Sequence, residues 1–263
     1  MKLSKLYNEL IRGDWADQKD TKGSQRNADA VLNYFGDDHD IRSITYQDVQ
    51  AFTESLKKKG MSGSTINRKL AALSKMYTVA QRHDRRIARV EITRQKESKP
   101  RQRVLTDAEA LALTSYPWAN PTFRDFTVLL MDTGIRPSEI TRGEWRVQGD
   151  ELTLVDTKNG DDRTVLLTPE AQEAAQRLRK SNGRIHYSTY SLAFRTALKE
   201  LGIKGDVVPY TMRHTALTRL GNATENVILI QKWAGHKNLQ TTQRYIKVSR
   251  KGLEGLANVL RRS

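Results

Sequence analysis

The chain has 263 residues, which exceeds the usual size of a single domain; one domain and two are both open on length alone, and two are expected. It contains 45 Lys and Arg residues against 30 Asp and Glu residues, a net charge of +15. This excess favours a polyanionic partner such as nucleic acid, while charge alone leaves open ribosomal or membrane-surface roles and a basic protein that merely stays soluble. The absence of cysteine excludes disulfides, thiolate metal sites and a cysteine nucleophile.

Neither a secretory signal nor a membrane span is visible in the sequence. Residues 1–5 lead into polar sequence rather than an apolar signal core, and the apolar run at 227–230 is far too short to cross a bilayer. We therefore expect a soluble, cytoplasmic protein without a membrane partner.

Residues 1–95 are predicted to form a small helical domain. Thr45 and Asp48 have the spacing of a capping box, and Gly60 is expected to end that helix. Its apolar face consists of Val49, Phe52 and Leu56. The lysines at 57–59 suit the negative end of the helix dipole or a DNA contact equally well.

The next predicted helix begins near Ser62 or Ser64 and is amphipathic. Its apolar positions are Ile66, Leu70, Leu73, Met76 or Tyr77, and Ala80. Three basic residues, Arg68, Lys75 and Arg82, recur every seven positions and therefore line up along another face. They are candidate contacts to a DNA backbone, and a solvated basic face explains them equally well.

A basic stretch follows, with nine Lys or Arg against three Asp or Glu over residues 82–103. Because apolar residues are few and the charges are alike, an extended connector is expected here. We place the linker at 96–103, between a domain at 1–95 and a second domain at 104–263.

The second domain is predicted to be mostly helical with a small antiparallel β-sheet. Thr106 with Glu109 predicts a capping box, and Pro121, Pro137 and Thr168 are expected to mark helix starts. Strands are expected at 151–156 and 164–167, joined around the Asn-Gly turn at 159–160, and further helices near 188–201, 211–220, 224–234 and 250–260. The fold class expected for the chain is therefore mainly α, with an α+β second domain.

Two arginines, a histidine and a tyrosine lie in short motifs of this second domain. The motifs are GIRPSE at 134–139, YTMRHT at 210–215, AGH at 234–236 and TTQRY at 241–245. A phosphodiester resists attack because its non-bridging oxygens repel nucleophiles and gain charge in the transition state, so preorganised cations are needed. Two guanidiniums, an imidazole and a phenol form a set suited to this chemistry.

These motifs resemble those of the tyrosine recombinases of the phage integrase family, and the resemblance covers most of the chain. The first motif is similar to the family's first-arginine motif, and Glu139 lies three residues after Arg136, within helical reach of orienting that region. The second is similar to the H-x-x-R-H-T box around Arg213. The spacing from Gly235 to Tyr245 matches G-H-x(4)-T-T-x-x-Y, with nine residues from His236 to the tyrosine.

The resemblance implies a catalytic set made of Arg136, Lys158, Tyr210, Arg213, His236 and Tyr245. Tyr245 would attack the scissile phosphate and form a 3′-phosphotyrosyl link, while Lys158, before the Asn-Gly turn, would protonate the departing 5′ oxygen. Arg136, Arg213 and His236 would stabilise the transition state. No cofactor and no metal are implied.

The chain departs from the family pattern at Tyr210, where the family usually has histidine. A phenol is a poor base at neutral pH but can donate a hydrogen bond to a phosphate oxygen, so Tyr210 is given a supporting role. His214, adjacent to Arg213, points about 100° around the helix and is expected to be structural.

By the same resemblance, the first domain binds core DNA and the second is catalytic, and together they form a C-shaped clamp around duplex DNA. The partners implied are double-stranded DNA attachment sites, a homotetramer on two duplexes and accessory DNA-bending proteins, for integration or excision of a phage or mobile element. Residues 1–23 are too few for the additional arm-binding domain of large phage integrases. The predicted C-terminal helix, with Leu253, Leu256 and Leu260, suits docking on a neighbouring protomer or packing on its own domain.

Other functions remain open or fit less well. A type IB topoisomerase would use the same chemistry on a single duplex, and a DNA-binding protein without catalysis would use the same surfaces. A structural basic protein would show no site preference at moderate salt. The sequence has no Walker-type phosphate loop, and its five histidines lack metal-ligand spacing, which disfavours ATPases and metal-dependent nucleases.

Overall fold

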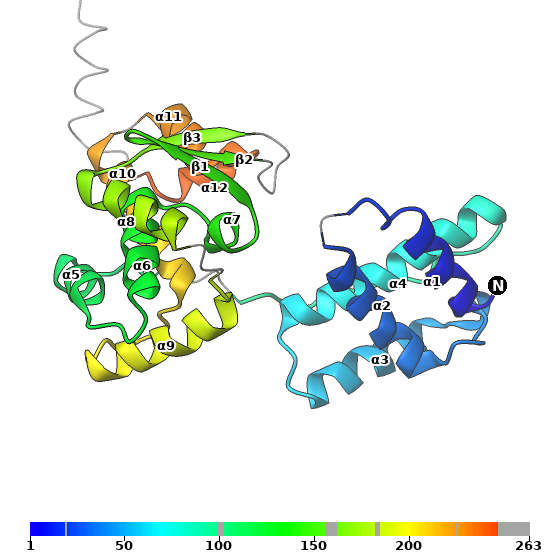
Figure 1. Ribbon diagram of the computed structural model, residues 1–263. Helices are drawn as coiled ribbons and strands as arrows, with labels where there is room; N and C mark the ends of the chain where they lie inside the picture. Colours follow the sequence, from blue (N-terminus) through cyan, green and yellow to red (C-terminus); the bar gives the residue numbers. More distant parts are fainter. Residues whose placement is uncertain (19, 99–102, 156–161, 182–184, 225, 247–263) are drawn as a thin grey trace, which may run out of the picture. The chain divides into compact units, whose positions relative to one another are not determined.

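The computed structural model divides the chain into two compact units, Met1–Pro100 and Arg101–Ser263 (Figure 1). It describes all residues except 19, 99–102, 156–161, 182–184, 225 and 247–263. The predicted helix at 250–260 and its leucines, the Asn-Gly turn and Lys158 therefore lie outside the described residues.

The N-terminal unit is helical. Its elements are α1 (Leu3–Arg12), α2 (Thr21–Phe35), the short 3-10 helix η1 (Ile41–Ser43), α3 (Tyr46–Lys58) and α4 (Gly63–His83). Helix α4 contacts α1, α2 and α3, so the longest helix forms the centre of the unit. The sequence analysis did not predict the bounds of α1 or α2. Each has only three buried residues among many polar ones, so its apolar signal is weak.

The local signals predicted in this unit are confirmed. Thr45 and Asp48 form a reciprocal capping box at the start of α3, and Ser62 caps α4. The predicted apolar positions of both helices are buried. Burial of these faces supplies most of the unit's stability, since isolated helices of this length are marginal in water.

The residues after α4 pack on the N-terminal unit for most of their length. Ile87 is buried in its core, and Asn67 binds the backbone of Gln95 through both its amide nitrogen and its amide oxygen. A Cβ on Gly63 would lie 2.1 Å from the carbonyl oxygen of Lys96, so the two backbones touch. Helix α4 extends through Arg82 to His83, and most of the residues after it that contact the N-terminal unit fall within the predicted domain at 1–95. The placement of the linker at 96–103 stays a prediction.

The described residues of the C-terminal unit form eight helices and three strands. The bounds in chain order are α5 (Asp107–Ser115), α6 (Pro121–Thr133), α7 (Pro137–Thr141), β1 (Glu144–Gln148), β2 (Glu151–Val155), β3 (Arg163–Leu166), α8 (Pro169–Lys180), α9 (Tyr187–Glu200), α10 (Pro209–Ala223), α11 (Val227–Ala234) and α12 (Leu239–Gln243). Helix α6 packs against α5, α8 and α10, and this places its C-terminal end in the interior.

The three strands form an antiparallel sheet in the order β1-β2-β3 (Figure 1). The predicted strands correspond to β2 and β3 within about one residue, whereas β1 was not predicted. Gly149 has a φ of 58° in the turn from β1 to β2, a conformation that favours glycine. Leu152 and Leu154 of β2 are buried, so one face of the sheet joins the core.

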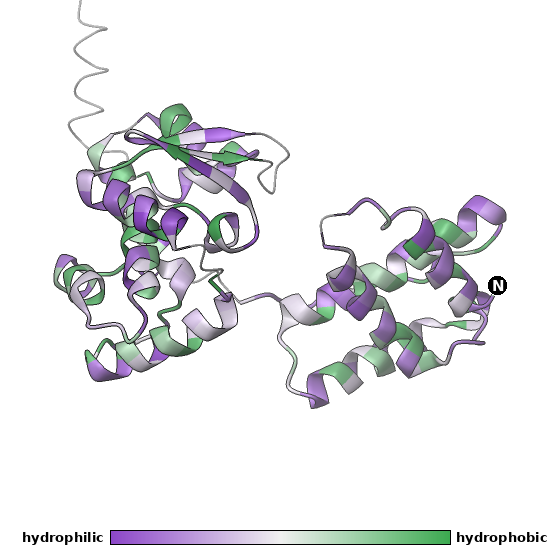
Figure 2. Ribbon diagram, in the orientation of Figure 1, coloured by the Kyte–Doolittle hydropathy of each residue, from purple (hydrophilic) through white to green (hydrophobic). Residues whose placement is uncertain are grey.

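An aromatic cluster fills the middle of the C-terminal unit. Trp118 stacks on Tyr190 and Phe194, and Tyr190 meets Phe123 and Phe126 edge to face. Figure 2 shows hydrophobic and hydrophilic residues alternating around the helices of each unit, as such cores require.

The predicted fold class, mainly α with a small antiparallel sheet in the second unit, is confirmed. Among the described residues, the helices are too short or too polar to span a bilayer.

Removing one helix cap should measurably destabilise the C-terminal unit. Thr106 accepts a hydrogen bond from the Glu109 amide at 3.2 Å, and the Glu109 carboxylate accepts one from the Thr106 amide at 2.9 Å. Thr106→Ala should lower the free energy of unfolding by about 1 kcal/mol in denaturant titrations. Thr196→Ala is the control, since Thr196 is exposed within α9; an equal loss in both variants would contradict the role of the cap.

Candidate active site

The last turn of α11 gathers three arginine side chains. The consecutive carbonyl oxygens of residues 233–235 accept hydrogen bonds from Arg163 (3.1 Å), Arg213 (2.7 Å) and Arg136 (3.0 Å), in that order. The helix ends there because Gly235 adopts a left-handed φ of 61°. Carbonyl groups at a helix C-terminus carry partial negative charge, so this end of α11 stabilises cations.

Arg213 is the most deeply buried of the three, with no exposed surface. Its Nη1 donates to the carbonyl oxygen of Gly134 at 2.7 Å, at the C-terminal end of α6, so the guanidinium joins the ends of two helices. Burial, with the charge of Arg136, lowers the pKa of Arg213 to about 10, which leaves it charged at neutral pH. Its Nε has no hydrogen-bond partner among the described residues.

Glu139 fixes the other two arginines. Its carboxylate accepts from the Arg136 amide at 2.7 Å and from the Arg136 side chain at 2.9 Å, and it binds both terminal nitrogens of Arg163 at 2.6 and 2.9 Å. Burial alone would raise the pKa of Glu139, but the hydrogen bonds and charges of the two arginines outweigh it and leave this pKa below its usual value. Glu139 thus contacts Arg136 directly, in the region that its spacing of three residues indicated.

His236 is held as a neutral ring. Burial, reinforced by the charges of Arg213 and Arg136, lowers the pKa of His236 to about 3. Arg213 donates to its Nε2 at 2.9 Å, so that nitrogen is an acceptor, and Nδ1 donates to the Thr242 hydroxyl at 2.9 Å. In this arrangement both ring nitrogens are occupied, and the imidazole orients Arg213.

Tyr245 follows α12 and lies against α10 and α11, with 6 % of its surface exposed. Its ring stacks on His236 with centroids 6.2 Å apart, and its hydroxyl forms a 2.8 Å hydrogen bond with Nδ1 of His214. Burial raises the pKa of Tyr245, although nearby Arg213 acts in the opposite direction. A Cβ on Gly221 would lie 2.0 Å from the Tyr245 carbonyl oxygen, so glycine admits this backbone against α10.

The cluster therefore has room for a negative charge. Arg136, Arg163 and Arg213 contribute three positive charges, and Glu139 supplies the negative charge among the groups bonded to them. Beside it lies a cavity of about 300 Å³ that Arg136, Arg142 and Tyr210 help to line. A phosphate in that cavity would meet a guanidinium with 14 % of its side chain exposed.

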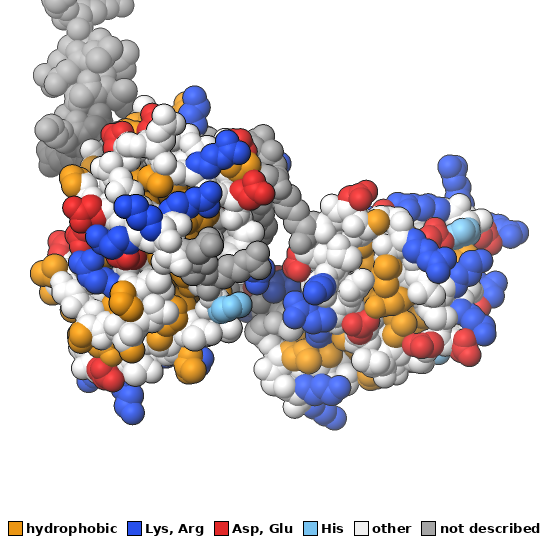
Figure 3. All heavy atoms as spheres, in the orientation of Figure 1, with side chains coloured by type: hydrophobic (Ala, Val, Ile, Leu, Met, Phe, Trp, Pro, Cys, Tyr) orange, Lys and Arg blue, Asp and Glu red, His pale blue; other side chains and the backbone are white. Residues whose placement is uncertain are grey.

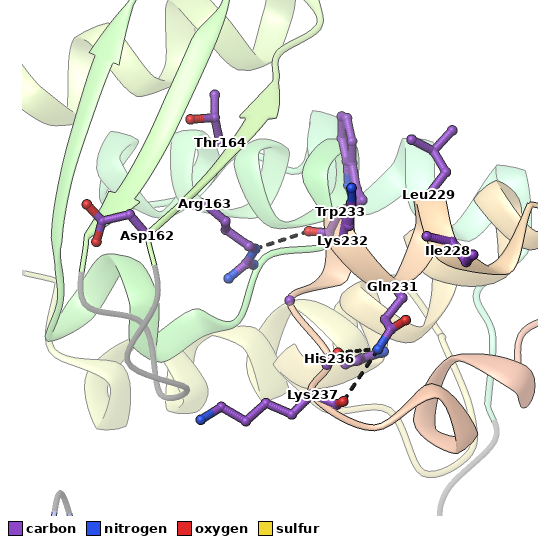
Figure 4. Close-up of a pocket in the computed structure, with 11 residues that line it drawn as sticks. Asp162, Arg163, Thr164, Ile228, Leu229, Gln231, Lys232, Trp233, His236 and Lys237 are labelled. Carbon is purple, nitrogen blue, oxygen red and sulfur yellow. Dashed lines mark hydrogen bonds between the residues drawn. The ribbon is translucent and has the colours of Figure 1, made fainter.

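A second cavity, of about 640 Å³, lies between β3 and α11 (Figure 4). Arg163 extends from β3 across it to the carbonyl of Trp233, and Gln231 bonds the backbone beyond the helix end (Figure 4). These contacts hold the loop that carries His236 against the sheet.

The structure brings together Arg136, Arg213, His236 and Tyr245, from four separate segments of the chain. Tyr210 lies on α10 at the wall of the smaller cavity, 37 % exposed. Sequence analysis missed two members of the cluster. For Arg163 the sequence offers only a weak signal, a basic residue next to a predicted strand. His214 is expected from the sequence to be structural, but it contacts the Tyr245 hydroxyl.

The three basic residues predicted to face DNA in the N-terminal unit share a side of α4, and two of them are paired. Asp14 binds Lys75 at 2.9 Å and Arg82 at 2.6 Å, whereas Arg68 is exposed. Figure 3 shows Lys and Arg side chains interspersed with Asp and Glu on the visible face of each unit. Only part of the charge at these positions is therefore left for a polyanion.

No group of three or more His, Asp or Glu residues with metal-binding geometry occurs in the described part of the chain.

Comparisons with known proteins give consistent results. The model of the phage integrase family matches residues 103–251, and that of the phage integrase N-terminal SAM-like domain matches residues 25–84. Tyrosine recombinase XerA of Saccharolobus solfataricus is 27% identical over 220 residues, which is 78% of this chain and 75% of the relative. XerA of Pyrococcus furiosus is 27% identical over 97% of this chain and 94% of its own length.

Solved structures share the fold. A lambda integrase tetramer bound to a Holliday junction has a TM-score of 0.77 at 18% identity, covering 94% of this chain and 78% of that one. The Tn1549 transposon integrase in complex with a circular intermediate DNA has a TM-score of 0.75 at 21% identity, covering 98% and 99%.

Neutralising Glu139 should destabilise the protein in a pH-dependent manner. Because the folded-state pKa of Glu139 is depressed, its contribution is present above the ordinary value of 4.5 and is lost as pH falls through the folded-state pKa. Glu139→Gln should cost about 3–5 kcal/mol at neutral pH, as expected for a broken buried ion pair, and less in acid. Denaturant titrations across pH, with exposed Glu151→Gln as control, test this; a pH-independent difference would contradict it.

Adding a methyl group at residue 221 should displace the segment that carries Tyr245. The new Cβ would overlap the Tyr245 carbonyl, so Gly221→Ala should accelerate hydrogen exchange of amides 239–246 by about tenfold or more. Asn222→Ala, at the adjacent exposed position of α10, should leave exchange unchanged. Protection that persists in Gly221→Ala would show that this contact is unimportant.

Proposed function

The chain belongs to the phage integrase family, and we propose that it is a site-specific DNA recombinase that cleaves and rejoins double-stranded DNA through a 3′-phosphotyrosyl intermediate. The observation that carries the proposal is the cluster of three guanidiniums with one compensating carboxylate beside a buried tyrosine. Such a cluster is suited to a phosphodiester, whose charge grows in the transition state.

In the proposed reaction, the Tyr245 hydroxyl attacks the scissile phosphorus and forms a new P–O bond, while the bond to the 5′ oxygen breaks. Lys158 supplies the proton that the departing oxygen takes up. The free 5′ hydroxyl then attacks the phosphotyrosyl bond of the partner duplex. Because the tyrosyl phosphodiester keeps the energy of the original bond, rejoining needs no nucleotide cofactor.

Arg136 and Arg213 are proposed to bind the non-bridging oxygens of the scissile phosphate. Their contacts to Glu139 and to the end of α11 hold both guanidiniums before DNA arrives, so the two guanidiniums themselves need little reorganisation. Losing one preorganised donor of this kind commonly costs about 10²- to 10³-fold in rate. His236 contributes by orienting Arg213, and Tyr210 donates from the wall of the cavity.

Access to Arg213 requires a local movement in this proposal. Arg213 has no exposed surface, whereas Arg136 is partly exposed and Tyr210 is 37 % exposed. The phosphate therefore meets Arg136 and Tyr210 first, and it reaches Arg213 once groups that cover this guanidinium move aside.

The partners follow from the same proposal. We expect double-stranded DNA attachment sites bound by both units, with the N-terminal unit acting as the core-binding domain, and a homotetramer on two duplexes. The lambda integrase structure, a tetramer on a Holliday junction, supports this assembly by analogy of fold. Integration or excision of a mobile element in the cytoplasm, with accessory DNA-bending proteins, is the proposed setting. Formation of a four-way junction would separate this function from that of a type IB topoisomerase.

Covalent capture of DNA tests the proposed function. The wild-type chain is incubated with nicked duplexes of random sequence, in which the short cleaved strand diffuses away, and protein–DNA adducts are isolated and sequenced. We expect an adduct with wild type and none with Tyr245→Phe. Tyr116→Phe is the control and should also form the adduct, because Tyr116 is remote in sequence from Tyr245 and its hydroxyl binds Glu200. The adduct should also form in chelator.

An adduct that persists in Tyr245→Phe would contradict the assignment of the nucleophile. A strict requirement for magnesium would contradict the metal-independent mechanism.

A further inference from the structure

The hydroxyl of Tyr245 is hydrogen-bonded to a group that can accept a proton. Nδ1 of His214 lies 2.8 Å from it, and the two rings have centroids 5.7 Å apart. His214 is partly buried on α10, one turn after Tyr210, whose ring meets the imidazole edge to face at 5.3 Å. The imidazole therefore stands between the two phenols.

The other polar groups around Tyr245 in the described part of the chain are poor proton acceptors. The guanidiniums of Arg213 and Arg244 have no free lone pair to offer. Both ring nitrogens of His236 are already bonded, and a second phenol, Tyr210, is a weak base at neutral pH. Nδ1 of His214 is the basic atom in contact with the nucleophile.

We propose that His214 is a catalytic residue that accepts the phenolic proton of Tyr245 during cleavage and returns it during rejoining. This rests on the proposed function. The proton moves from the tyrosine oxygen to Nδ1 as the P–O bond to tyrosine forms, while the 5′ oxygen leaves with a proton from the general acid. In the reverse step, the imidazolium protonates the departing tyrosine and the general acid regains its proton from the attacking 5′ hydroxyl.

The role requires the neutral imidazole with its hydrogen on Nε2, so that Nδ1 carries the lone pair. Burial, together with the charges of Arg244 and Arg213, lowers the pKa of His214 below 6.5 and keeps the ring neutral before DNA binds. The groups that face it are Tyr210 and Arg213 on α10 and Arg244 and Tyr245 after α12. An arriving phosphate offsets the two arginine charges, and this increases the basicity of the imidazole when the proton must be taken up.

The test measures the rate of adduct formation on duplexes recovered by covalent capture with the wild-type chain. His214→Asn is the central variant, because the amide oxygen of asparagine can occupy the position of Nδ1 and accept a hydrogen bond but cannot take the proton. His214→Ala removes the contact altogether. His39→Asn, in the N-terminal unit, is the matched control and should react at the wild-type rate.

We expect His214→Asn and His214→Ala both to slow adduct formation by about 10²-fold or more, the usual contribution of a general base. Wild-type rates should rise with pH through the pKa of His214, and this rise should be absent in His214→Asn. DNA binding, measured in parallel by gel shift, should be retained.

A second substrate separates the base from the acid. Placing sulfur at the bridging 5′ position gives a leaving group that needs no proton, so this substrate should restore cleavage in Lys158→Ala but not in His214→Asn. Rescue of His214→Asn by sulfur would assign His214 to the leaving group and overturn the proposal.

Two further outcomes would also overturn it. Wild-type rates in His214→Asn with slow cleavage in His214→Ala would show that the contact only positions the phenol, and wild-type rates in both would show that it is dispensable. Failure of the proposed function appears differently, as the absence of any Tyr245-dependent adduct with the wild-type chain.

Discussion

The end of α11 is the feature on which the C-terminal unit depends. Three consecutive carbonyls there bind three arginines, and without them the guanidiniums would be buried beside one another with one carboxylate for compensation. Burying an unpaired cation is costly, so the helix terminus and Glu139 make the cluster possible. The same contacts tie α6, α7 and β3 to α11, which makes the packing of the unit and the geometry of the site a single arrangement.

This excess of positive charge has chemical consequences for its neighbours. It holds His236 neutral, so that ring accepts a hydrogen bond from Arg213 instead of repelling it. It also leaves a place for an anion near Tyr245, a buried residue whose hydroxyl is hydrogen-bonded to His214. A site of this kind is prepared for the charge of the transition state before DNA binds, and this is how electrostatic catalysis avoids reorganisation during the reaction.

Much of the fold could be predicted because its signals are local. Capping boxes at Thr45 and Thr106, together with Pro121 and Gly134, mark helix ends within a few residues, and the motifs identified Arg136, Arg213, His236 and Tyr245. Arg163 and His214 escaped because their roles depend on strand pairing and on a contact 31 residues away in sequence. The spacing of the basic residues on α4 could not reveal that Asp14, far away in the chain, pairs with Lys75 and Arg82, and their contact with DNA stays a prediction.

The most direct measurement is a structure of the Tyr245→Phe chain bound to the duplex recovered by covalent capture. The account predicts that Arg136 and Arg213 bind the non-bridging oxygens of one phosphate, whose phosphorus lies in line between the 5′ oxygen and the place of the missing hydroxyl, about 3–3.5 Å from it. A phosphate bound elsewhere, with the guanidinium cluster still closed and empty and residue 245 remote from the DNA backbone, would contradict it.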